Sequence, residues 1–310
     1  MLKKTVDKDK KLLWISPFVV FLGPQLAQMQ LYTSTADLQK ALRSEKSKKR
    51  SVGLVPTMGA LHSGHLSLVK RSLYQNDITI VSIFVNPTQF NDKNDLAAYP
   101  RTLDKDLNLL SSEKGEIWVY APEANDIYGG DVLSKKYDFK GLDQVMEGPN
   151  RPGHFDGVAT IVERLLRIVR PHHAYFGEKD YQQLLIISRV AKQKRLGVKI
   201  VGCGIVREDS GLAMSSRNQR LNSVAISEAT FIYQQLLWAK RRFTSMSLTK
   251  IKEAVTEAFK SNTSFELEYF EIAEAAMLTA HSERKKNKKY RAFIAAKIDG
   301  VRLIDNLAMN

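Results

Sequence analysis

The sequence predicts an α/β fold, in which helices cover both faces of a doubly wound parallel sheet, followed by a smaller α+β domain. Three observations support this prediction. Apolar strand-like segments alternate with amphipathic helical segments from residue 29 to about residue 206. One of them, ITIVSIFV at residues 78–85, is almost continuously apolar, as expected of a strand buried on both faces. After residue 206 the alternation stops, and two helical segments precede three strand-like ones.

The larger part supplies its elements in a regular order. The predicted elements are a helix at 36–46 with Thr35 as its N-cap, a strand at 52–55, a glycine-containing loop at 56–64, a helix with His65 in its first turn, the strand at 78–85, a helix at 103–115 ended by Gly115, a strand at 116–120, a helix at 158–169, a strand at 173–176, a helix at 181–197 and a buried strand at 198–206. Such alternation favours parallel pairing and a Rossmann-like sheet. Ligands of these sheets bind at the carboxyl ends of the strands.

The remaining elements form a second, smaller unit. They are helices at 227–243 and 247–261 and strands at 265–273, 290–298 and 301–304, the last two joined by an Asp-Gly turn. We therefore predict a larger domain at 29–206 and a smaller one at 207–310. Residues 1–28 are expected to be an extension outside both domains. Their apolar run is interrupted by Pro17 and is too short to span a bilayer, although a membrane or transit role is the alternative.

Composition excludes several classes of protein. With 310 residues, 44% hydrophobic and 26% charged, the chain is an ordinary globular protein. Its single cysteine, Cys203, excludes a disulfide framework and a thiolate metal cluster, so we expect a buried thiol and a cytoplasmic location. The net charge of +14 invites a nucleic-acid interpretation. However, the lysine and arginine runs contain no interleaved aromatic residues, which favours solvated surface over a polyanion site.

The segment VPTMGALHSGHLSLV at residues 55–69 is the clearest candidate site. It leads from a strand through a loop into a helix, and a helix N-terminus presents free N–H groups that suit phosphate. His62 and His65 would add donors to a phosphoryl group as charge develops on it. Two alternatives remain at this point, namely a pair of metal ligands and histidines that merely cap the helix.

His62-Ser-Gly-His65 resembles the His-x-Gly-His signature of the nucleotidyltransferase superfamily that includes class I aminoacyl-tRNA synthetases. Six ordered blocks make the chain similar to one family within it, the pantothenate synthetases or pantoate–β-alanine ligases. The blocks are residues 55–69, 82–90, 99–107, 151–162, 176–184 and 207–221. The resemblance implies ATP-dependent joining of pantoate to β-alanine through a pantoyl-adenylate, with AMP and pyrophosphate released. Because the carboxylate of pantoate attacks the α-phosphorus, the protein needs to position substrates and neutralise charge rather than supply a nucleophile.

The resemblance also implies roles for individual residues. The catalytic set would be His62, His65, Lys179, Ser215, Ser216 and Arg217, with the last three at the β- and γ-phosphates. The wider ATP site would add Pro56, Thr57, Met58, Gly177, Asp180, Val206 and Met214. Gln89 and Gln183 match the glutamines that bind pantoate, beside Met58, although a glutamine satisfied by the backbone is the alternative. Arg151 and His154 match a block that lines the site.

Magnesium is expected with ATP, because the phosphates must be neutralised. Asp104 and Asp106 are the candidate carboxylates. At helical spacing they point in different directions, so at most one of them is expected to act, through water. The expected partners are the three small substrates and a second copy of the chain, with no nucleic acid and no membrane. Another adenylyl-transferring enzyme of the superfamily is the alternative function, which the paired glutamines disfavour.

Overall fold

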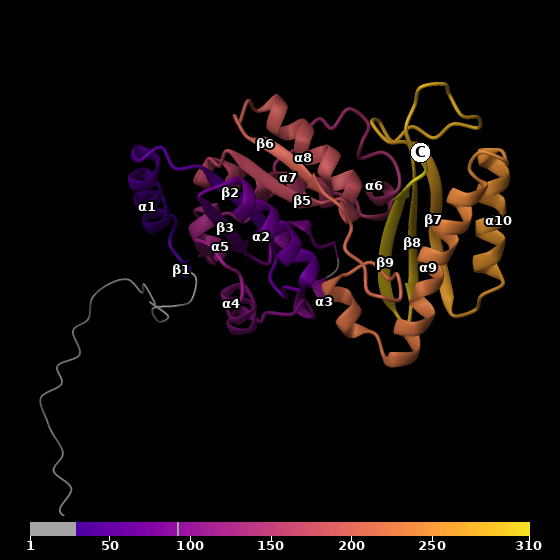
Figure 1. The fold of residues 1–310 in the computed structure, drawn as a ribbon, viewed down its shortest axis with the longest axis horizontal. Coiled ribbons are helices and arrows are strands. Elements are labelled where there is room, and N and C mark those ends of the chain that lie inside the picture. The colour runs from indigo at the N-terminus through magenta and orange to yellow at the C-terminus, as the bar shows by residue number, and fades with distance from the viewer. Residues whose placement is uncertain (1–28, 92) are drawn as a thin grey trace, which may run out of the picture.

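The structure, a computed structural model, describes residues 29–91 and 93–310. The extension predicted at residues 1–28 lies outside the described residues. Two sheets organise the described part of the chain, and they lie side by side along its longest axis (Figure 1).

The larger sheet has six strands, and every neighbouring pair is parallel. Its order is β1 (Met29–Tyr32), β4 (Ile117–Tyr120), β3 (Ile78–Ile83), β2 (Val52–Thr57), β5 (His173–Gly177) and β6 (Lys199–Cys203). The predicted central strand is β3, which is buried over nearly its whole length. The chain first adds strands on one side of β2 and then on the other, so the winding reverses between β2 and β5.

Helices cover both faces of this sheet, which confirms the predicted fold class. The α-helices of this part are α1 (Thr35–Ser47), α2 (Ser63–Gln75), α3 (Lys93–Ala97), α4 (Leu103–Ser111), α5 (Ala124–Tyr128), α6 (Glu147–Asn150), α7 (His154–Val169) and α8 (Tyr181–Gln193). Alternate residues of β3 enter two separate cores. Ile80 packs in the core that includes α1, α7 and α8, whereas Val81 packs in the core that includes α2 and α4.

Two local predictions about this sheet were wrong. The N-cap of α1 is Ser34, whose hydroxyl accepts from the N–H of Asp37 (3.4 Å), because the hydroxyl of Thr35 is instead bound to Tyr120 and Asp126. The strand expected to be buried near Cys203 is β6, which is an edge strand with exposed and half-buried residues. Its apolar residues still contact both cores, Ile200 on one face and Val201 on the other, but they are only half-buried at the edge of the sheet, as is Cys203.

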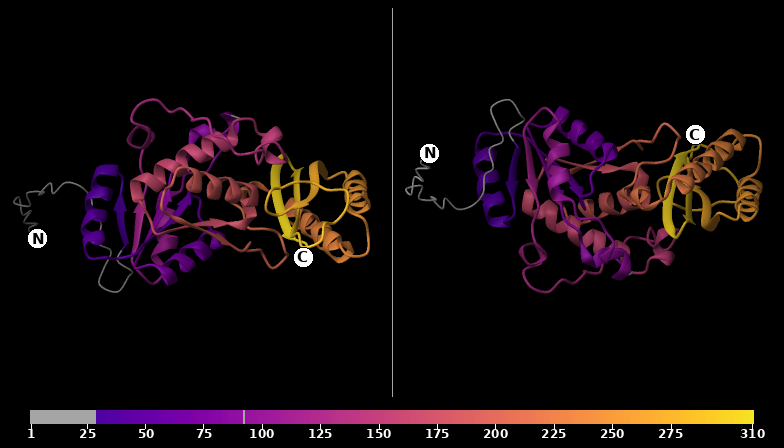
Figure 2. Two further views of the ribbon diagram at one scale, coloured as in Figure 1. Left: turned by 90° about the horizontal axis from the view of Figure 1, so that it is seen from above. Right: turned by 90° about the horizontal axis from the view of Figure 1, so that it is seen from below.

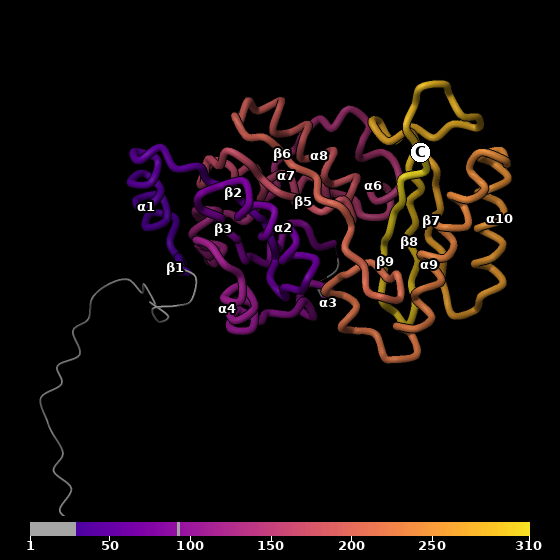
Figure 3. Tube along the Cα trace, viewed as in Figure 1, coloured from indigo at the N-terminus to yellow at the C-terminus, as the bar shows by residue number. Residues whose placement is uncertain are grey.

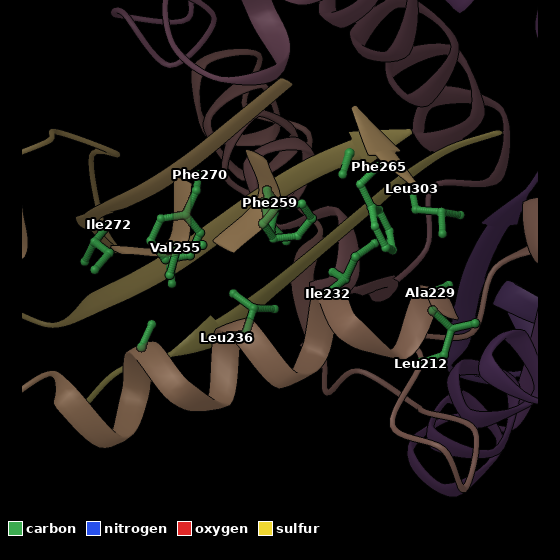
Figure 4. Close-up of a cluster of buried hydrophobic side chains, with 14 of the residues drawn as sticks. Leu212, Ala229, Ile232, Leu236, Val255, Phe259, Phe265, Phe270, Ile272 and Leu303 are labelled. Carbon is green, nitrogen blue, oxygen red and sulfur yellow. The ribbon is translucent and has the colours of Figure 1, made fainter. Parts of the chain in front are cut away.

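The smaller sheet is antiparallel and consists of β7 (Phe265–Glu274), β8 (Tyr290–Ile298) and β9 (Val301–Ala308). Asp299 and Gly300 both have positive φ, as a tight hairpin turn requires. Helices α9 (Ser223–Arg242) and α10 (Leu248–Lys260) lie against one face of the sheet (Figure 2). Figure 4 shows the resulting core, in which Ile232 and Leu236 of α9 face the aromatic side chains of the sheet and α10.

The opposite face of the small sheet lies against the larger part of the chain. A mixed apolar cluster joins Phe155 of α7 and Ile186 of α8 to Phe293 of β8. The segment between β6 and α9 runs from the large sheet to the small one and carries a short 3-10 helix, η3 (Ser216–Arg220) (Figure 3). The domain boundary predicted between residues 206 and 207 falls in this segment and stays a prediction. Within residues 29–91 and 93–310, no helix is long and apolar enough to cross a membrane.

Candidate active site

The candidate site is a cavity of about 240 Å³ at the carboxyl ends of β2, β3, β5 and β6. The loops that follow these four strands form much of its wall, and residues of η3 close another side. The cavity lies where the order of the strands reverses, which is where parallel α/β sheets commonly bind their ligands.

Every residue predicted to bind ATP or pantoate lines this cavity. They are Pro56, Thr57, Met58, His62, His65, Gln89, Gly177, Lys179, Asp180, Gln183, Val206, Met214, Ser215, Ser216 and Arg217. Arg151 and His154 line it as well. The cavity thus brings together side chains from positions 56 to 217, while the role of each remains a prediction.

The two histidines form the N-terminal cap of α2. The N–H of Gly64 donates to Nδ1 of His62 (3.1 Å), and the N–H of His62 donates to Nδ1 of His65 (3.3 Å). This reciprocal arrangement is a capping box built from imidazoles. Capping was the alternative to a phosphate role, yet both rings also face the cavity, so one arrangement serves the helix and leaves the second ring nitrogens available.

The histidines are neutral donors in the free protein. Burial, together with the nearby Lys179 ammonium, lowers the pKa of His62 to about 4. Burial lowers the pKa of His65 to about 3, assisted by His62 and Lys179. Because Nδ1 accepts a backbone hydrogen bond in each neutral ring, the proton is on Nε2. Each ring therefore offers an N–H donor to a ligand without carrying a charge of its own.

The His62 ring leaves no room for a side chain at Gly64, between the two histidines. A Cβ atom at this position would lie 2.8 Å from Cε1 and 2.9 Å from Nδ1 of the His62 ring. Any side chain would push this ring out of its capping position. The glycine is thus required by close approach, as its backbone stays in the ordinary negative-φ helical range.

Lys179 approaches the cavity from the end of β5. It belongs to a short 3-10 helix, η2 (Glu178–Asp180), directly before α8. Its Nζ lies 3.7 Å from a carboxylate oxygen of Asp180, and the lysine side chain is 19% exposed. A flexible ammonium at this place can follow a phosphate, since it carries three donors on a long stem.

The Ser215, Ser216 and Arg217 segment forms another part of the cavity wall. The Ser215 hydroxyl caps η3 by accepting from the N–H of Arg217 (3.2 Å). Nη2 of Arg217 donates to Asp95 of α3 (3.0 Å), whose other oxygen accepts from Arg220 (3.0 Å). Arginine carries five N–H donors, so an anion can bind Arg217 beside this carboxylate through the donors that Asp95 does not use.

Gln89 is held by a network of neutral groups. Nδ2 of Asn86 donates to Oε1 of Gln89 (3.1 Å), and Nε2 of Gln89 lies 2.9 Å from Sδ of Met58. The buried His154 ring is bonded through Nδ1 to the carbonyl oxygen of Gln89 (2.8 Å). These contacts fix both the main chain and the amide of Gln89 at the cavity wall.

The neighbouring glutamines of α8 have different surroundings. Gln182 is buried, and its amide donates to the carbonyl oxygens of Leu142 (2.7 Å) and Val145 (2.9 Å). Gln183 lines the cavity. The alternative for each predicted pantoate glutamine was a side chain satisfied by backbone groups. Gln182 is such a residue, and it was not among the predicted pantoate residues.

Sequence reasoning missed several residues of the wall. Tyr99 lies in a block that was recognised, and its hydroxyl is 3.3 Å from Oγ of Ser216. Asn86 belongs to another recognised block, and its burial could not be inferred from a polar sequence. Part of the apolar wall comes from one face of α7, at the spacings of an amphipathic helix: Val158, Ile161, Val162 and Leu165.

The predicted metal carboxylates do not fit a metal site. Asp106 is 2% exposed, and its two oxygens accept from the N–H groups of Ala60 (3.0 Å) and Leu61 (2.8 Å). Burial raises the pKa of Asp106 despite these hydrogen bonds. Asp104 is exposed, and neither residue lines the cavity. Among the described residues, no group of three or more His, Cys, Asp or Glu is arranged to hold a metal.

Comparisons with known proteins agree with this geometry. The family model described as pantoate-beta-alanine ligase matches residues 30–308. A pantothenate synthetase from Christiangramia forsetii is 52% identical over 91% of this chain and all of its own length, and one from Flavobacterium psychrophilum is 48% identical with the same coverage.

Two solved structures extend the comparison. The crystal structure of pantothenate synthetase from Thermus thermophilus has a TM-score of 0.83 and 37% identity, covering 90% of this chain and 99% of that one. A pantoate-beta-alanine ligase from Francisella tularensis, crystallised with a β,γ-ATP compound and β-alanine, has a TM-score of 0.74 and 36% identity, covering 91% and 98%. By its sequence, its fold and the residues gathered in its cavity, the chain belongs to the pantoate–β-alanine ligase family.

Proposed function

We propose that the cavity at the ends of β2, β3, β5 and β6 is where this chain performs its family's reaction. As a member of the family, the chain uses ATP to join pantoate to β-alanine and releases AMP and pyrophosphate. The pantoate carboxylate first attacks the α-phosphorus of ATP, and pyrophosphate leaves. The amine of β-alanine then attacks the carbonyl carbon of the pantoyl-adenylate, loses a proton, and displaces AMP.

The observation that carries the proposal is the state of the two histidines. Their Nδ1 atoms are occupied by backbone donors, so their Nε2–H groups are fixed as donors at the mouth of a helix N-terminus. Such preorganised donors stabilise charge that grows on a phosphoryl group, because they need no rearrangement as the reaction proceeds. Lys179 and Arg217 line the same cavity and supply full positive charge.

The substrates divide the cavity between them in this proposal. ATP lies along the histidines, with Gly177 and Asp180 at its nucleoside and Ser215, Ser216 and Arg217 at the leaving pyrophosphate. Pantoate lies between Gln89 and Gln183, whose amides suit its hydroxyls. Its geminal methyl groups then pack against the apolar face of α7, where burial of apolar surface favours binding.

Three further statements belong to the proposal. Magnesium enters as part of the ATP substrate, held by phosphates and water, since Asp106 is engaged by backbone N–H groups and neither Asp104 nor Asp106 lines the cavity. The active assembly is a homodimer, which light scattering on purified protein tests. The protein works in the cytoplasm, which fractionation of cells tests.

The decisive experiment measures pyrophosphate release from purified protein with ATP and magnesium. With pantoate alone we expect at most about one equivalent per site, because the adenylate stays bound. Addition of β-alanine should then start continuous turnover, with AMP and pantothenate as products. Release that ignores pantoate in folded protein would refute the substrate assignment, and release with pantoate alone at a steady rate would indicate a different adenylyltransferase.

A further inference from the structure

We propose that Asn306, a residue of the small sheet, is a positioning residue that sets the place of Lys179 in the cavity. The inference rests on the proposed role of Lys179 at the phosphates. It concerns a residue that does not line the cavity and lies 127 positions away from the lysine in the chain.

Asn306 belongs to β9, and both the nitrogen and the oxygen of its side-chain amide are hydrogen-bonded. Its Nδ2 donates both hydrogens to consecutive carbonyl oxygens, those of Glu178 (2.9 Å) and Lys179 (2.9 Å). Its Oδ1 accepts from Nη1 of Arg291 on the adjacent strand β8. Asn306 is 2% exposed, so water cannot replace these bonds.

The asparagine is itself held firmly. Its backbone N–H donates to Oδ1 of Asp305 (2.7 Å), and the Asp305 carboxylate receives two donors from Arg207 (2.6 and 2.9 Å). Arg291, which fixes Oδ1 of Asn306, also donates to the Glu178 carboxylate (2.8 Å). Arg207 thus holds Asn306 through Asp305, and Arg291 holds it directly. Arg291 also ties β8 to Glu178, the residue before Lys179.

The turn that carries Lys179 needs such an anchor. Helix η2 is only three residues long, and 3-10 geometry gives few internal hydrogen bonds. The carbonyl groups of Glu178 and Lys179 point toward the small sheet and are satisfied there by Asn306. Loss of both donors would remove the hydrogen bonds that tie these two carbonyl groups to the small sheet, and would free the peptide that positions the ammonium. A displacement of about 1 Å can lower a rate by as much as roughly 100-fold.

The test compares two asparagines of the same sheet region. In Asn306→Leu both donors are lost. Asn310→Leu is the control at an exposed position: the Asn310 amide also bridges backbone groups, donating to the carbonyl of Lys288 (2.9 Å) and accepting from the N–H of Tyr290 (2.8 Å), away from the cavity. Asn306→Asp keeps the size and the acceptor for Arg291 and serves if the leucine variant does not fold.

The measurement is equilibrium binding of a non-hydrolysable ATP analogue, with single-turnover adenylate formation as the second readout and thermal melting as the check of folding. We expect Asn306→Leu to weaken binding about 5-fold and slow adenylate formation by about 10-fold or more, and Asn310→Leu to change neither. The sharp readout is a double-mutant cycle with Lys179→Ala. If Asn306 acts through Lys179, its replacement has no further effect once the lysine is gone.

The outcomes separate this inference from the function on which it rests. If Lys179→Ala leaves binding and adenylate formation intact, the proposed role of the lysine fails. If Lys179→Ala is impaired and both folded Asn306 variants behave like wild type, the positioning role fails alone. Losses that simply multiply in the double variant also overturn it, because they show that Asn306 acts independently of the lysine.

Discussion

Lys179 is the residue whose removal most directly tests the charge balance of the cavity. We expect Lys179→Ala to lower the single-turnover rate of adenylate formation by about 100-fold or more, because a preorganised charge at the transferring phosphoryl group is lost. Lys192→Ala on the exposed side of α8 is the control and should retain the wild-type rate. A rate within about 3-fold of wild type in a folded Lys179 variant would remove this residue from the catalytic set.

The burial of His154 can be tested by measuring how the stability of the protein changes with pH. Burial and the neighbouring Arg151 lower the pKa of His154 to about 3 from its ordinary value of 6.5. Between these two pH values the unfolded chain binds a proton at His154 that the folded chain does not. The contribution of His154 to the free energy of unfolding is therefore complete above pH 6.5 and is lost as pH falls toward 3. The slope amounts to about 1.4 kcal/mol per pH unit for one proton.

His154→Gln removes this proton uptake. We expect the free energy of unfolding from urea titrations to fall less steeply between about pH 6 and 5 in the variant, by at most about 1.4 kcal/mol per pH unit. Part of the slope should remain, because the pKa values of His62 and His65 are lowered in the same direction. An unchanged slope would show that His154 is protonated in the folded protein as readily as in the unfolded one.

Helix α7 and the short helix η1 (Pro87–Gln89) touch at the level of their backbones. A Cβ at Gly157 would lie 2.2 Å from the carbonyl oxygen of Thr88, which is far inside contact distance. We expect Gly157→Ala to push α7 away from η1, costing roughly 1–3 kcal/mol of stability and raising the KM for pantoate more than that for ATP. Gly204→Ala, whose Cβ meets no atom within 4 Å, is the control for stability. Equal stability of the two variants would contradict this contact.

The patterns that predicted these elements were the strong, local ones. The almost continuously apolar sequence of β3 and the alternation of strand and helix were sufficient for the fold class, because a strand buried on both faces has few polar residues. The edge position of β6 was not predictable, since the sequence of an apolar strand does not show whether it pairs with one neighbouring strand or with two. Ser34 and Thr35 are both cap-forming residue types, and the contacts of Thr35 with the distant Tyr120 and Asp126 are not visible in the sequence.

The candidate site was predictable where its residues lie in short, recognisable loops. His62, Lys179 and Arg217 fall in such loops and line one cavity. Asp106 was assigned to a metal because an acidic pair suggests one, whereas its actual partners are backbone N–H groups, which leave no trace in a sequence. Asn306 was not identified for the same reason, since its partners are carbonyl groups.

The two sheets are joined across the molecule by a buried ion pair. Glu147 of α6 is 6% exposed and accepts two hydrogen bonds from Arg302 of β9 (2.8 and 2.7 Å) and one from Tyr269 of β7 (2.7 Å). Arg151, which lines the cavity, lies 3.6 Å from the same carboxylate. This cluster therefore fixes the small sheet and one wall of the cavity with the same charge.

Arg302→Gln should destabilise the protein more than any comparable surface change. Glu147 would remain buried with its main partner gone, which costs roughly 2–4 kcal/mol, somewhat below the range for a fully buried pair because the Arg302 side chain is 23% exposed. Lys260→Gln breaks the exposed pair with Glu257 and is the control, with an expected change under about 1 kcal/mol. Urea unfolding at about pH 7 measures both.

The pH dependence of this variant identifies the carboxylate as the cause. Although burial opposes ionisation, the hydrogen bonds and charge of Arg302 lower the pKa of Glu147 to about 2 from 4.5. The stability that Glu147 contributes is thus present above pH 4.5 and lost as pH falls toward 2. Without Arg302 the pKa of Glu147 should rise, so acidification from about pH 5 should cost the variant less than it costs the wild type. A variant and wild type that differ by the same amount at about pH 7 and about pH 4 would show that the loss comes from packing and not from the buried charge.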